Sequence, residues 1–485
     1  MTSQDVAVHS MPVHRGCGVL TSPTPRRGEG VGGLRPPFFT FRTPIRRIGY
    51  GEGAPTSRPE PPHPNPLPSG ERGFACACRS IFTAAVLLLC ACLTTPAHAD
   101  AAFQSWLQSL WPQAQAIGVS RATFDLATRG LEPDLSLPEL VLPGRPERPS
   151  GAQPEFVLTP ADYLKEPTFD GLAAKGRKLF DQYRDPLNAI EKQFGVPPAI
   201  VLAIFGRETD YGQARDKRNA IRVLATQAYL GKRKEKFLDE FLQALKILDE
   251  GQVKLADMTS SWAGAMGLTQ FMPSDYVKYA VDFDGDGHPN IWTSVPDALA
   301  SAAKQLQGKG WQRGLRWAYE VHPPADVDCT IGVPDNTLPI GEWLKRGYVP
   351  AYGRTLSAAE RAETASLLQP AGLYGPSFLA TKNYFVIKEY NFSDLYVLFV
   401  GHLADRIADP RPFETPWSKV AQLPTADLDK MQHILTDRGF YHDKIDGKAG
   451  MLTRSALGAY QKRNGLKVDC WPTAAVLAHM EAGRN

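Results

Sequence analysis

Cysteine is scarce over most of this 485-residue chain, which contains only seven. Five of them lie within the first 92 residues, and the other two are Cys329 and Cys470. Two cysteines cannot form the framework of several disulfides that stabilises many small secreted domains. The sequence leaves open whether these two pair with each other.

Residues 100–485 carry no excess of positive charge. The first 99 residues hold 10 arginines and 5 acidic residues, and the whole chain has a formal net charge of +3. Subtracting the leader from the totals of 54 basic and 51 acidic residues leaves 44 and 46, a net charge of −2. Phosphate binding requires clustered positive charge, so the sequence disfavours a nucleic-acid partner.

A long hydrophobic run is also lacking. The apolar stretch Ile81–Leu93 is too short to span a bilayer permanently. Arg79 precedes it and Ala97-His98-Ala99 follows it, an arrangement typical of a secretory signal that is removed before Asp100. We therefore expect a periplasmic protein of 386 residues (485 − 99), with no transmembrane span in the mature chain.

Two further features of the leader bear on export. Leu89-Cys90-Ala91-Cys92 has the spacing of a lipidation site, so a lipid anchor at Cys92 is an alternative to cleavage before Asp100. The first 75 residues are rich in proline, glycine and arginine and have no apolar period. We expect these 75 residues to be disordered or to result from a mis-assigned start codon. Together with the signal peptide they make up a leader of residues 1–99.

Apolar residues recur with a helical period over much of residues 100–410. The predicted helices are Phe103–Leu126, Leu172–Phe194, Pro198–Glu208, Lys236–Asp249, Val295–Gln307, Ala359–Leu367 and a last one around Leu395–Ile407. A proline-rich segment at residues 131–160 separates the first two, and a short extended stretch is expected at Tyr384–Tyr390. These patterns predict a mainly α domain over residues 100–410 and a proline-rich linker at 411–424.

Glu208 lies at the end of one predicted helix, in the run Arg207-Glu208-Thr209-Asp210-Tyr211-Gly212. Ile200 and Ile204 recur every four residues with it, so its carboxylate shares the apolar face of the helix. Burial and the negative end of the helix dipole both favour the protonated form, which a general acid for glycosidic cleavage requires. The alternative is a glutamate paired to Arg207 or Arg215 at a helix end.

A second segment, residues 260–274, crowds small residues and glycines beside Gln270 and Phe271. Tightly packed backbone lets a polymer chain lie close, glutamine can hydrogen-bond sugars, and aromatic rings can stack on them. Together, Glu-Thr-Asp-Tyr-Gly at 208–212 and Ala-Gly-Ala-Met-Gly-Leu-Thr-Gln-Phe-Met-Pro at 263–273 resemble the lytic murein transglycosylases of the membrane-bound lytic transglycosylase B family. The resemblance covers about residues 100–410.

The resemblance implies a lysozyme-like fold and a set of residues along a glycan cleft. Matching residues contact the sugar acetamide and hold the catalytic glutamate, face the negatively charged lactyl or peptide portion, or belong to the late Tyr-Asn…Tyr element of the groove. The predicted substrate-binding residues are Ser261, Gln270, Phe271, Lys232, Arg233, Tyr390, Asn391 and Tyr396.

Residues 282–290 have the spacing of an EF-hand-type calcium loop. Asp282, Asp284 and Asp286 occupy ligand positions 1, 3 and 5, Gly287 provides the bend at position 6, and His288 offers a backbone carbonyl at position 7. Position 12 is a threonine where the usual pattern has a bidentate glutamate. In the resembled family a later aspartate closes a longer loop, which Asp297 matches one residue further along. We expect structural Ca²⁺ here; the alternative is an Asp/Gly turn held by side-chain hydrogen bonds.

The last sixty residues form a separate unit by their pattern. Two predicted helices, at 428–435 and 453–464, flank a glycine-punctuated turn, and a further turn and short helix follow. The pattern over residues 425–485 resembles the small three-helix peptidoglycan-binding domain, except that Cys470-Trp471 stands where that family commonly has a glycine-led turn. The alternative is a helical domain that only adds stability.

These observations predict a periplasmic lytic transglycosylase that cleaves the MurNAc–GlcNAc β-1,4 bond of peptidoglycan. Hydrolytic glycosidases usually need two carboxylates, and Asp210 points away from Glu208 around the helix. In a transglycosylase the muramic acid 6-hydroxyl attacks its own anomeric carbon, giving a 1,6-anhydro product, so one glutamate serves as acid and base. A hydrolytic muramidase and a non-catalytic peptidoglycan-binding protein are the alternatives.

Overall fold

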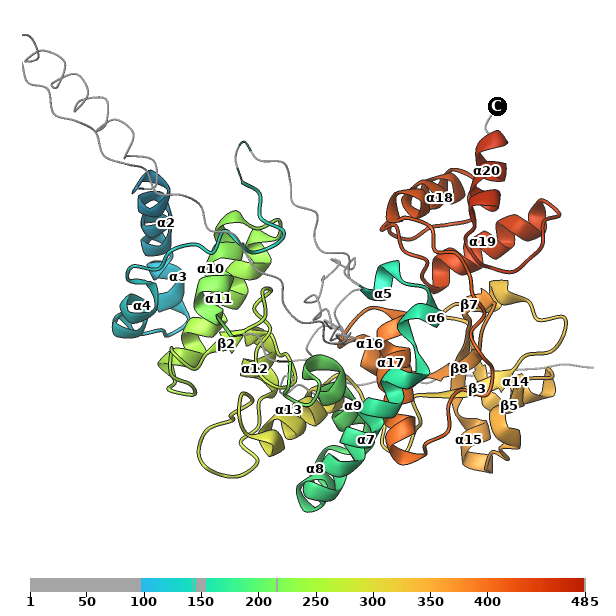
Figure 1. Ribbon diagram of the computed structural model, residues 1–485, viewed down its shortest axis with the longest axis horizontal. Helices are drawn as coiled ribbons and strands as arrows, with labels where there is room; N and C mark the ends of the chain where they lie inside the picture. The colour runs from blue at the N-terminus through green and yellow to red at the C-terminus, as the bar shows by residue number, and fades with distance from the viewer. Residues whose placement is uncertain (1–96, 143, 145–153, 215–216, 484–485) are drawn as a thin grey trace, which may run out of the picture. The chain divides into compact units, whose positions relative to one another are not determined.

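The computed structural model describes residues 97–142, 144, 154–214 and 217–483 (Figure 1). The last three residues of the predicted signal, 97–99, belong to helix α2 (Ala97–Ser109), whereas residues 1–96 of the predicted leader and signal peptide, with Cys92, and also Arg215 lie outside the described residues. Cys329 and Cys470 lie inside them and form a disulfide, with Cα atoms 6.2 Å apart.

The first part of the chain is helical, as the periodicity predicts. The pattern at 103–126 divides into three helices, and that at 172–194 into two, because tight turns interrupt each pattern. The helices are α2 (Ala97–Ser109), α3 (Trp111–Ala116), α4 (Arg121–Thr128), α5 (Pro154–Val157), α6 (Pro160–Tyr163), α7 (Glu166–Gln182), α8 (Arg184–Phe194), α9 (Pro198–Thr209), α10 (Ala220–Leu230), α11 (Lys234–Asp249), α12 (Pro273–Tyr279) and α13 (Val295–Gly308). A two-stranded antiparallel pair, β1 (Arg218–Asn219) with β2 (Thr259–Ser260), lies among them.

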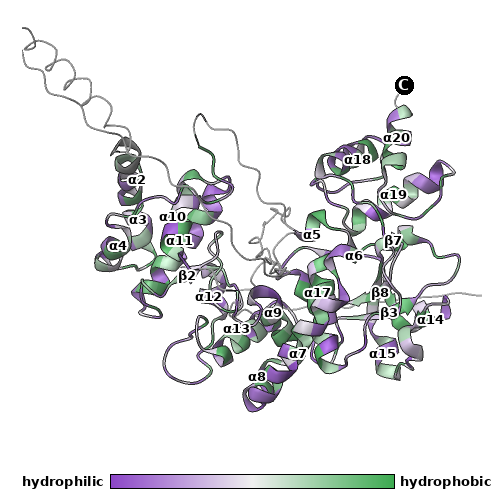
Figure 2. Ribbon diagram, viewed as in Figure 1, coloured by the Kyte–Doolittle hydropathy of each residue, from purple (hydrophilic) through white to green (hydrophobic). Residues whose placement is uncertain are grey.

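Helix α9 is the buried centre of this part. Pro197 and Pro198 begin it, since a first turn tolerates the missing N–H, and Asp210 ends it in the left-handed conformation. Every residue of α9 except Ala199 is buried. It packs against α7 and against α17 (Asp394–Ala408), in which only Asp405 and Ala408 are not buried. Figure 2 shows the hydrophobic colouring over much of α17. The core therefore surrounds the helix that carries Glu208.

A five-stranded antiparallel sheet follows, which the sequence analysis did not predict. Its order is β4-β6-β8-β3-β5, and Leu379 of β8 pairs with Tyr319 of β3 and with Leu367 of β6. The strands and helices of residues 318–388, of which β7 is outside the sheet order, are β3 (Ala318–His322), η1 (Cys329–Ile331), β4 (Thr337–Pro339), α14 (Ile340–Lys345), β5 (Val349–Pro350), η2 (Ala351–Gly353), α15 (Ala358–Ala362), β6 (Thr364–Leu368), β7 (Pro370–Leu373), β8 (Ser377–Thr381) and α16 (Lys382–Lys388).

Two sequence-based predictions are wrong in this region. The helix predicted at Ala359–Leu367 ends at Ala362, because the following residues are buried as strand β6, between β4 and β8. The extended stretch predicted at Tyr384–Tyr390 is helix α16, whose N-cap Thr381 accepts a hydrogen bond from the Asn383 N–H. A short apolar run does not distinguish strand from helix, and the pairing partners decide.

The C-terminal unit has three helices, as predicted: α18 (Thr425–Asp437), α19 (Met451–Arg463) and α20 (Ala474–Ala482). It has its own hydrophobic core, which includes Met431, Leu457 and Met480. The buried Gln432 amide holds the intervening turn, because its oxygen accepts from the N–H groups of Asp446 and Gly447. The Cys329–Cys470 disulfide joins this unit covalently to η1.

Within the described ranges, no single helix has the length and apolar composition needed to cross a membrane. The pair α8 and α9 meets those criteria only when taken together, and it is bent by 110°.

Candidate active site

The Glu208 side chain lies in the last turn of α9 and is only 2% exposed. The hydroxyl of Tyr396, from α17, donates a hydrogen bond of 2.6 Å to its Oε1 atom. Tyr396 is itself fully buried. Two helices that pack together therefore fix the position of this carboxyl group.

Burial raises the pKa of the Glu208 carboxyl from 4.5 to about 8. The Tyr396 hydrogen bond and the charge of Arg207 act in the opposite direction, and the charge of Glu155 adds to the increase. Desolvation is the largest cause, since an ionised carboxylate without water is poorly stabilised. Glu208 is therefore mainly protonated near neutral pH, the state that a general acid requires.

Arg207 is buried beside Glu208, and its guanidinium makes aromatic contacts. It donates a 2.7 Å hydrogen bond to the hydroxyl of Tyr163 and lies 5.2 Å from the ring centre of Phe399. Its positive charge lowers the pKa of Glu208, but desolvation outweighs it. The environment of Glu208 thus differs from that of a surface ion pair at a helix end.

Asp210 has a separate structural role. It ends α9 with a φ of 47°, and its carboxylate forms a 2.7 Å ion pair with Lys175 of α7. This ion pair holds the carboxylate in place at the end of α9.

The glycine-rich segment at 260–271 is a compact loop whose small residues are required by contact. A Cβ atom on Gly264 would lie 2.3 Å from a Leu224 methyl, and one on Gly267 would lie 2.6 Å from the carbonyl oxygen of Ile291. Both glycines also have positive φ, which larger residues rarely adopt. These positions therefore fit glycine alone.

Hydrogen bonds fasten this loop next to Glu208. The Thr209 hydroxyl donates to the carbonyl oxygen of Leu268 at 2.8 Å, and the Tyr390 hydroxyl donates to that of Thr269 at 2.6 Å. The structure thus brings together the two sequence motifs, some sixty residues apart, and the late tyrosine element.

Within the loop, the predicted residues have different environments. Ser261 is buried, and its hydroxyl accepts from the Ala265 N–H. Gln270 is partly exposed with a φ of 55°; its amide donates to the Gly267 carbonyl, and it lines a surface pocket with Trp292. Phe271 is 1% exposed and belongs to the core.

The remaining predicted residues divide into two groups. The Tyr390 ring lies parallel to that of Tyr396, with centroids 6.4 Å apart, and Asn391 is buried one residue later. Lys232 and Arg233 lie in the turn between α10 and α11, where Arg233 forms a 2.7 Å ion pair with Glu139. Tyr390 and Asn391 thus belong to the surroundings of Glu208, whereas Arg233 is engaged with Glu139.

Sequence reasoning missed Tyr163 and Glu155. Tyr163 accepts the Arg207 hydrogen bond, and Glu155 is a buried carboxylate on α5 whose Oε1 atom accepts from Asn391 at 3.4 Å. Both lie on four-residue helices at or just beyond the end of the proline-rich stretch 131–160, which lacks a periodic signal. Only the fold reveals their contacts with Arg207 and Asn391.

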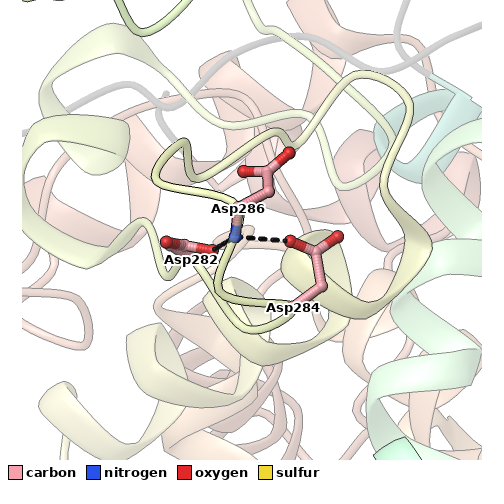
Figure 3. A group of neighbouring side chains, drawn as sticks. All are labelled: Asp282, Asp284 and Asp286. Atoms are coloured by element: carbon pink, nitrogen blue, oxygen red, sulfur yellow. Dashed lines mark hydrogen bonds between the residues drawn. The ribbon is translucent and has the colours of Figure 1, made fainter.

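The carboxylates of Asp282, Asp284 and Asp286 gather in one loop, with one oxygen from each within 4.8 Å of the others (Figure 3). Asp282 Oδ1 accepts from the N–H groups of Gly285 and Asp286, at 2.8 and 3.1 Å. Three hard oxygen donors at this separation fit a divalent cation such as Ca²⁺. The same hydrogen bonds also fit the alternative of an Asp/Gly turn.

Two further predicted ligands lie beside this cluster. Asp297, fully buried at the start of α13, accepts from the N–H groups of Phe283, Asp284 and Asn290. His288 is exposed, and its N–H donates to Asp286. Asp297 therefore holds the backbone of the loop and fastens it to α13.

Comparison with known proteins gives consistent matches along the described chain. Residues 102–405 match the family described as the transglycosylase SLT domain, and residues 425–480 match a putative peptidoglycan binding domain. Membrane-bound lytic murein transglycosylase B from Escherichia coli (strain K12) is 33% identical over 238 residues, which are 48% of this chain and 63% of that protein. The match thus spans less than two thirds of that relative.

Solved structures extend the comparison. SltB3 from Pseudomonas aeruginosa, in complex with NAG-anhNAM-pentapeptide, is 37% identical with a TM-score of 0.70; the match covers 78% of this chain and 99% of SltB3. Slt35 from Escherichia coli, in complex with calcium, is 31% identical with a TM-score of 0.45, over 52% of this chain and 81% of Slt35. The expectation of a mainly α, lysozyme-like fold with a C-terminal helical domain is confirmed. The chain belongs to the MltB/SltB family of lytic transglycosylases and carries a C-terminal peptidoglycan-binding domain.

Proposed function

We propose that this protein cleaves the MurNAc–GlcNAc β-1,4 bond of peptidoglycan and forms 1,6-anhydro-MurNAc, with Glu208 as the single acid and base. The observation that carries the proposal is the buried Glu208 carboxyl, whose pKa rises to about 8 and which Tyr396 orients. Such a group holds a proton at neutral pH and can donate it to a leaving oxygen.

In this reaction Glu208 gives one proton to the leaving oxygen and takes a different one from the muramic acid 6-hydroxyl. Glu208 donates its proton to the glycosidic oxygen as the bond to the anomeric carbon breaks. The muramic acid 6-hydroxyl then bonds to that carbon, and its proton passes to the Glu208 carboxylate. Glu208 is thereby restored without water, and the lost bond is replaced by the 1,6-anhydro bond. The engagement of Asp210 with Lys175 supports a mechanism that uses one carboxylate.

We assign the glycan groove to the residues around Glu208 and the adjoining loop. The short bond from Tyr396 to Glu208 and the anchoring of the loop by Tyr390 support a role in shaping this groove. Lys232 and Arg233 would face the acidic portion of the substrate. The proposed substrate-binding residues are Ser261, Gln270, Phe271, Lys232, Arg233, Tyr390, Asn391 and Tyr396.

Mass spectrometry of muropeptides released from purified sacculi tests this function. The proposal expects anhydro-muropeptides from the parent protein and none from Glu208→Gln. Reducing-end products without anhydro ends would identify a muramidase, because anhydro ends form only without water attack. Retention on sacculi with no soluble product would identify a non-catalytic binder.

We further propose that residues 425–485 hold the enzyme on peptidoglycan and that residues 411–424 link them to a catalytic domain at 100–410. The separate hydrophobic core of the C-terminal unit supports this division. Export to the periplasm through the predicted signal peptide, or through a lipid anchor at Cys92, fits a wall substrate.

The aspartate loop is proposed to bind a structural Ca²⁺. Asp282, Asp284 and Asp286 would supply carboxylate oxygens, the backbone of His288 a carbonyl, and Asp297 the closing carboxylate. Mutual repulsion of three close carboxylates would be relieved by a divalent cation, which explains how binding would stabilise the loop.

A further inference from the structure

One pocket is lined by both the transglycosylase domain and the C-terminal unit. Its volume is about 290 Å³, at the lower end of the range for small-ligand sites, which suits a group the size of an amino-acid side chain. Helix α5 and the start of α17 line one side, and the turn before α19 lines the other. A pocket shared by a domain that cleaves peptidoglycan and a domain that binds it can hold a part of that polymer.

Carboxylates and cations gather around this pocket. They are Glu155, Asp394, Asp443 and Asp446, and Lys388, Lys448 and Arg454. Two of the cations are already engaged, because Lys388 and Arg454 both form ion pairs with the buried Asp394. The other two aspartates are exposed to solvent. Glu155 and Lys448 are therefore the two opposite charges that are left to meet a ligand inside the pocket.

Glu155 is a buried acceptor with unused capacity. The residue is 4% exposed, and its Oε1 atom accepts from the Asn391 amide at 3.4 Å, whereas its Oε2 atom has no hydrogen-bond partner. A buried carboxyl oxygen without a partner costs free energy, which a donor on a ligand would recover. This oxygen therefore fits an ammonium group bound in the pocket.

Lys448 supplies the opposite charge from the C-terminal unit. Its ammonium lies 3.6 Å from the centre of the Phe156 ring, and burial lowers the pKa of this lysine. The charge of Glu155 attracts the ammonium, yet Glu155 Oε2 is not bonded to it. An aromatic face replaces the water around a cation only in part, so Lys448 can still receive an anion. Phe392 is 46% exposed and adds an open aromatic surface, against which an aliphatic chain can pack.

The pocket adjoins the surroundings of Glu208 through one short segment. Ser393 lines the pocket, and its hydroxyl donates to the Glu155 carbonyl oxygen at 3.4 Å. The same hydroxyl caps α17 by accepting from the Tyr396 N–H, and the Tyr396 side chain bonds to Glu208. The segment that orients Glu208 therefore also forms a wall of the pocket.

We propose that this pocket binds a zwitterionic amino-acid group, with Glu155 as the partner of its ammonium and Lys448 as the partner of its carboxylate. In peptidoglycan this group is the free end of diaminopimelate in a stem peptide, which carries an ammonium and a carboxylate on one carbon. Its aliphatic part packs against the rings of Phe156 and Phe392. The inference rests on the proposed function, because it takes the substrate to be a glycan strand that carries such peptides. The enzyme thereby favours strands whose stem peptides are not cross-linked through this ammonium.

Isothermal titration calorimetry of the full-length protein with soluble stem tripeptides tests the pocket. The probe is alanyl-γ-glutamyl-diaminopimelate with an acetylated N-terminus. One analogue carries lysine in place of diaminopimelate and so lacks the carboxylate, and a second has its side-chain amine acetylated. We expect the probe to bind and each analogue to bind about tenfold more weakly or worse. Absence of binding by the probe, or equal binding of all three peptides, would overturn the inference.

Substitutions locate the binding. Glu155→Gln and Lys448→Met should each weaken binding of the diaminopimelate peptide by about tenfold or more, whereas Lys448→Arg should retain most of it. The matched controls are Glu240→Gln and Lys444→Met, which should leave the affinity unchanged. Glu240 is 6% exposed, and both its carboxylate oxygens accept from Ser274; Lys444 is exposed in the same turn as Lys448. The Tm of each variant shows whether it folds, and if Glu155→Gln does not, Lys448→Met decides. Unchanged binding in Lys448→Met, or an equal loss in the controls, would contradict the assignment.

A second measurement uses the substrate itself. The ratio of kcat/KM for strands with free diaminopimelate amines to kcat/KM for strands with these amines acetylated should be several-fold above one in the parent and close to one in Lys448→Met. A general effect of the substitution on catalysis cancels in this ratio. A ratio of one in the parent, or an unchanged ratio in Lys448→Met, would overturn the inference. The proposed function fails separately, namely if the parent binds the peptide but releases no anhydro-muropeptides.

Discussion

Replacing Glu208 by glutamine should stabilise the folded protein by an amount that increases with pH. The pKa of this carboxyl is 4.5 in a solvated chain and about 8 in the fold. The folded state therefore holds a proton between these values that the unfolded chain has lost. The contribution of the Glu208 carboxyl to the free energy of unfolding is complete below pH 4.5. It is lost progressively as the pH rises from 4.5 through about 8.

The magnitude follows from the same two pKa values. At pH 7 the linkage costs the parent protein about 3 kcal/mol relative to strongly acidic solution, and at pH 5 about 1 kcal/mol. Glutamine carries no charge at any pH, so Glu208→Gln avoids this cost. The stability difference between variant and parent should therefore increase by about 2 kcal/mol from pH 5 to pH 7.

Urea unfolding of both proteins at pH 5, 6 and 7 measures this difference. A constant effect of the amide on packing cancels, because only the change with pH is used. A difference that does not vary with pH would mean that Glu208 is ionised in the fold at pH 5 and above. That result would refute both the raised pKa and the reasoning that makes Glu208 a proton donor.

Three further predictions concern function and the other two sites. Glu208→Gln should lower muropeptide release by more than tenfold and leave sacculus pull-down unchanged, because the amide keeps the shape but carries no transferable proton; activity within tenfold of the parent would remove Glu208 from the mechanism. Calcium at a hundredfold excess over its Kd should stabilise the fold by about 2.7 kcal/mol and raise the Tm by a few degrees, and magnesium should do less. The double variant Asp284→Ala with Asp286→Ala should erase the effect. Equal Tm values with chelator and with calcium would mean that the aspartate loop is only a hydrogen-bonded turn. Deleting residues 421–485, with Cys329→Ser to avoid a free thiol, should weaken sacculus retention and preserve cleavage of soluble glycans. The full-length Cys329→Ser protein is the control that separates loss of the domain from loss of the disulfide. Unchanged retention of the deletion variant would contradict the binding role.

The sequence predicted the central helices well because each is an apolar run longer than a strand. Helices α9 and α17 pack on each other and are buried on almost every side, so most of their positions are apolar. The sheet was missed since its strands are two to five residues long, and β6 and β8 are buried through pairing on both sides. Pairing between distant strands leaves no local signal.

The candidate site was partly predictable for a related reason. Glu208 and the glycine-rich loop are sequence motifs, so they were found, and the fold joins them through Thr209 and Tyr390. Glu155 and Tyr163 lie on four-residue helices in or beside a proline-rich stretch, and their partners Asn391 and Arg207 are 236 and 44 positions away. Contacts between segments so far apart in the sequence arise only once the chain is folded.

The disulfide between Cys329 and Cys470 has a topological consequence. It closes a covalent ring that contains the linker at 411–424, since the two cysteines are 141 positions apart. A protease that cuts one peptide bond in that linker would open the ring without releasing either piece. Separation of the C-terminal helices α18, α19 and α20 from the rest of the protein would then require reduction as well as cleavage. The bond thus protects the union of the two units against the single backbone cut to which an exposed linker is prone.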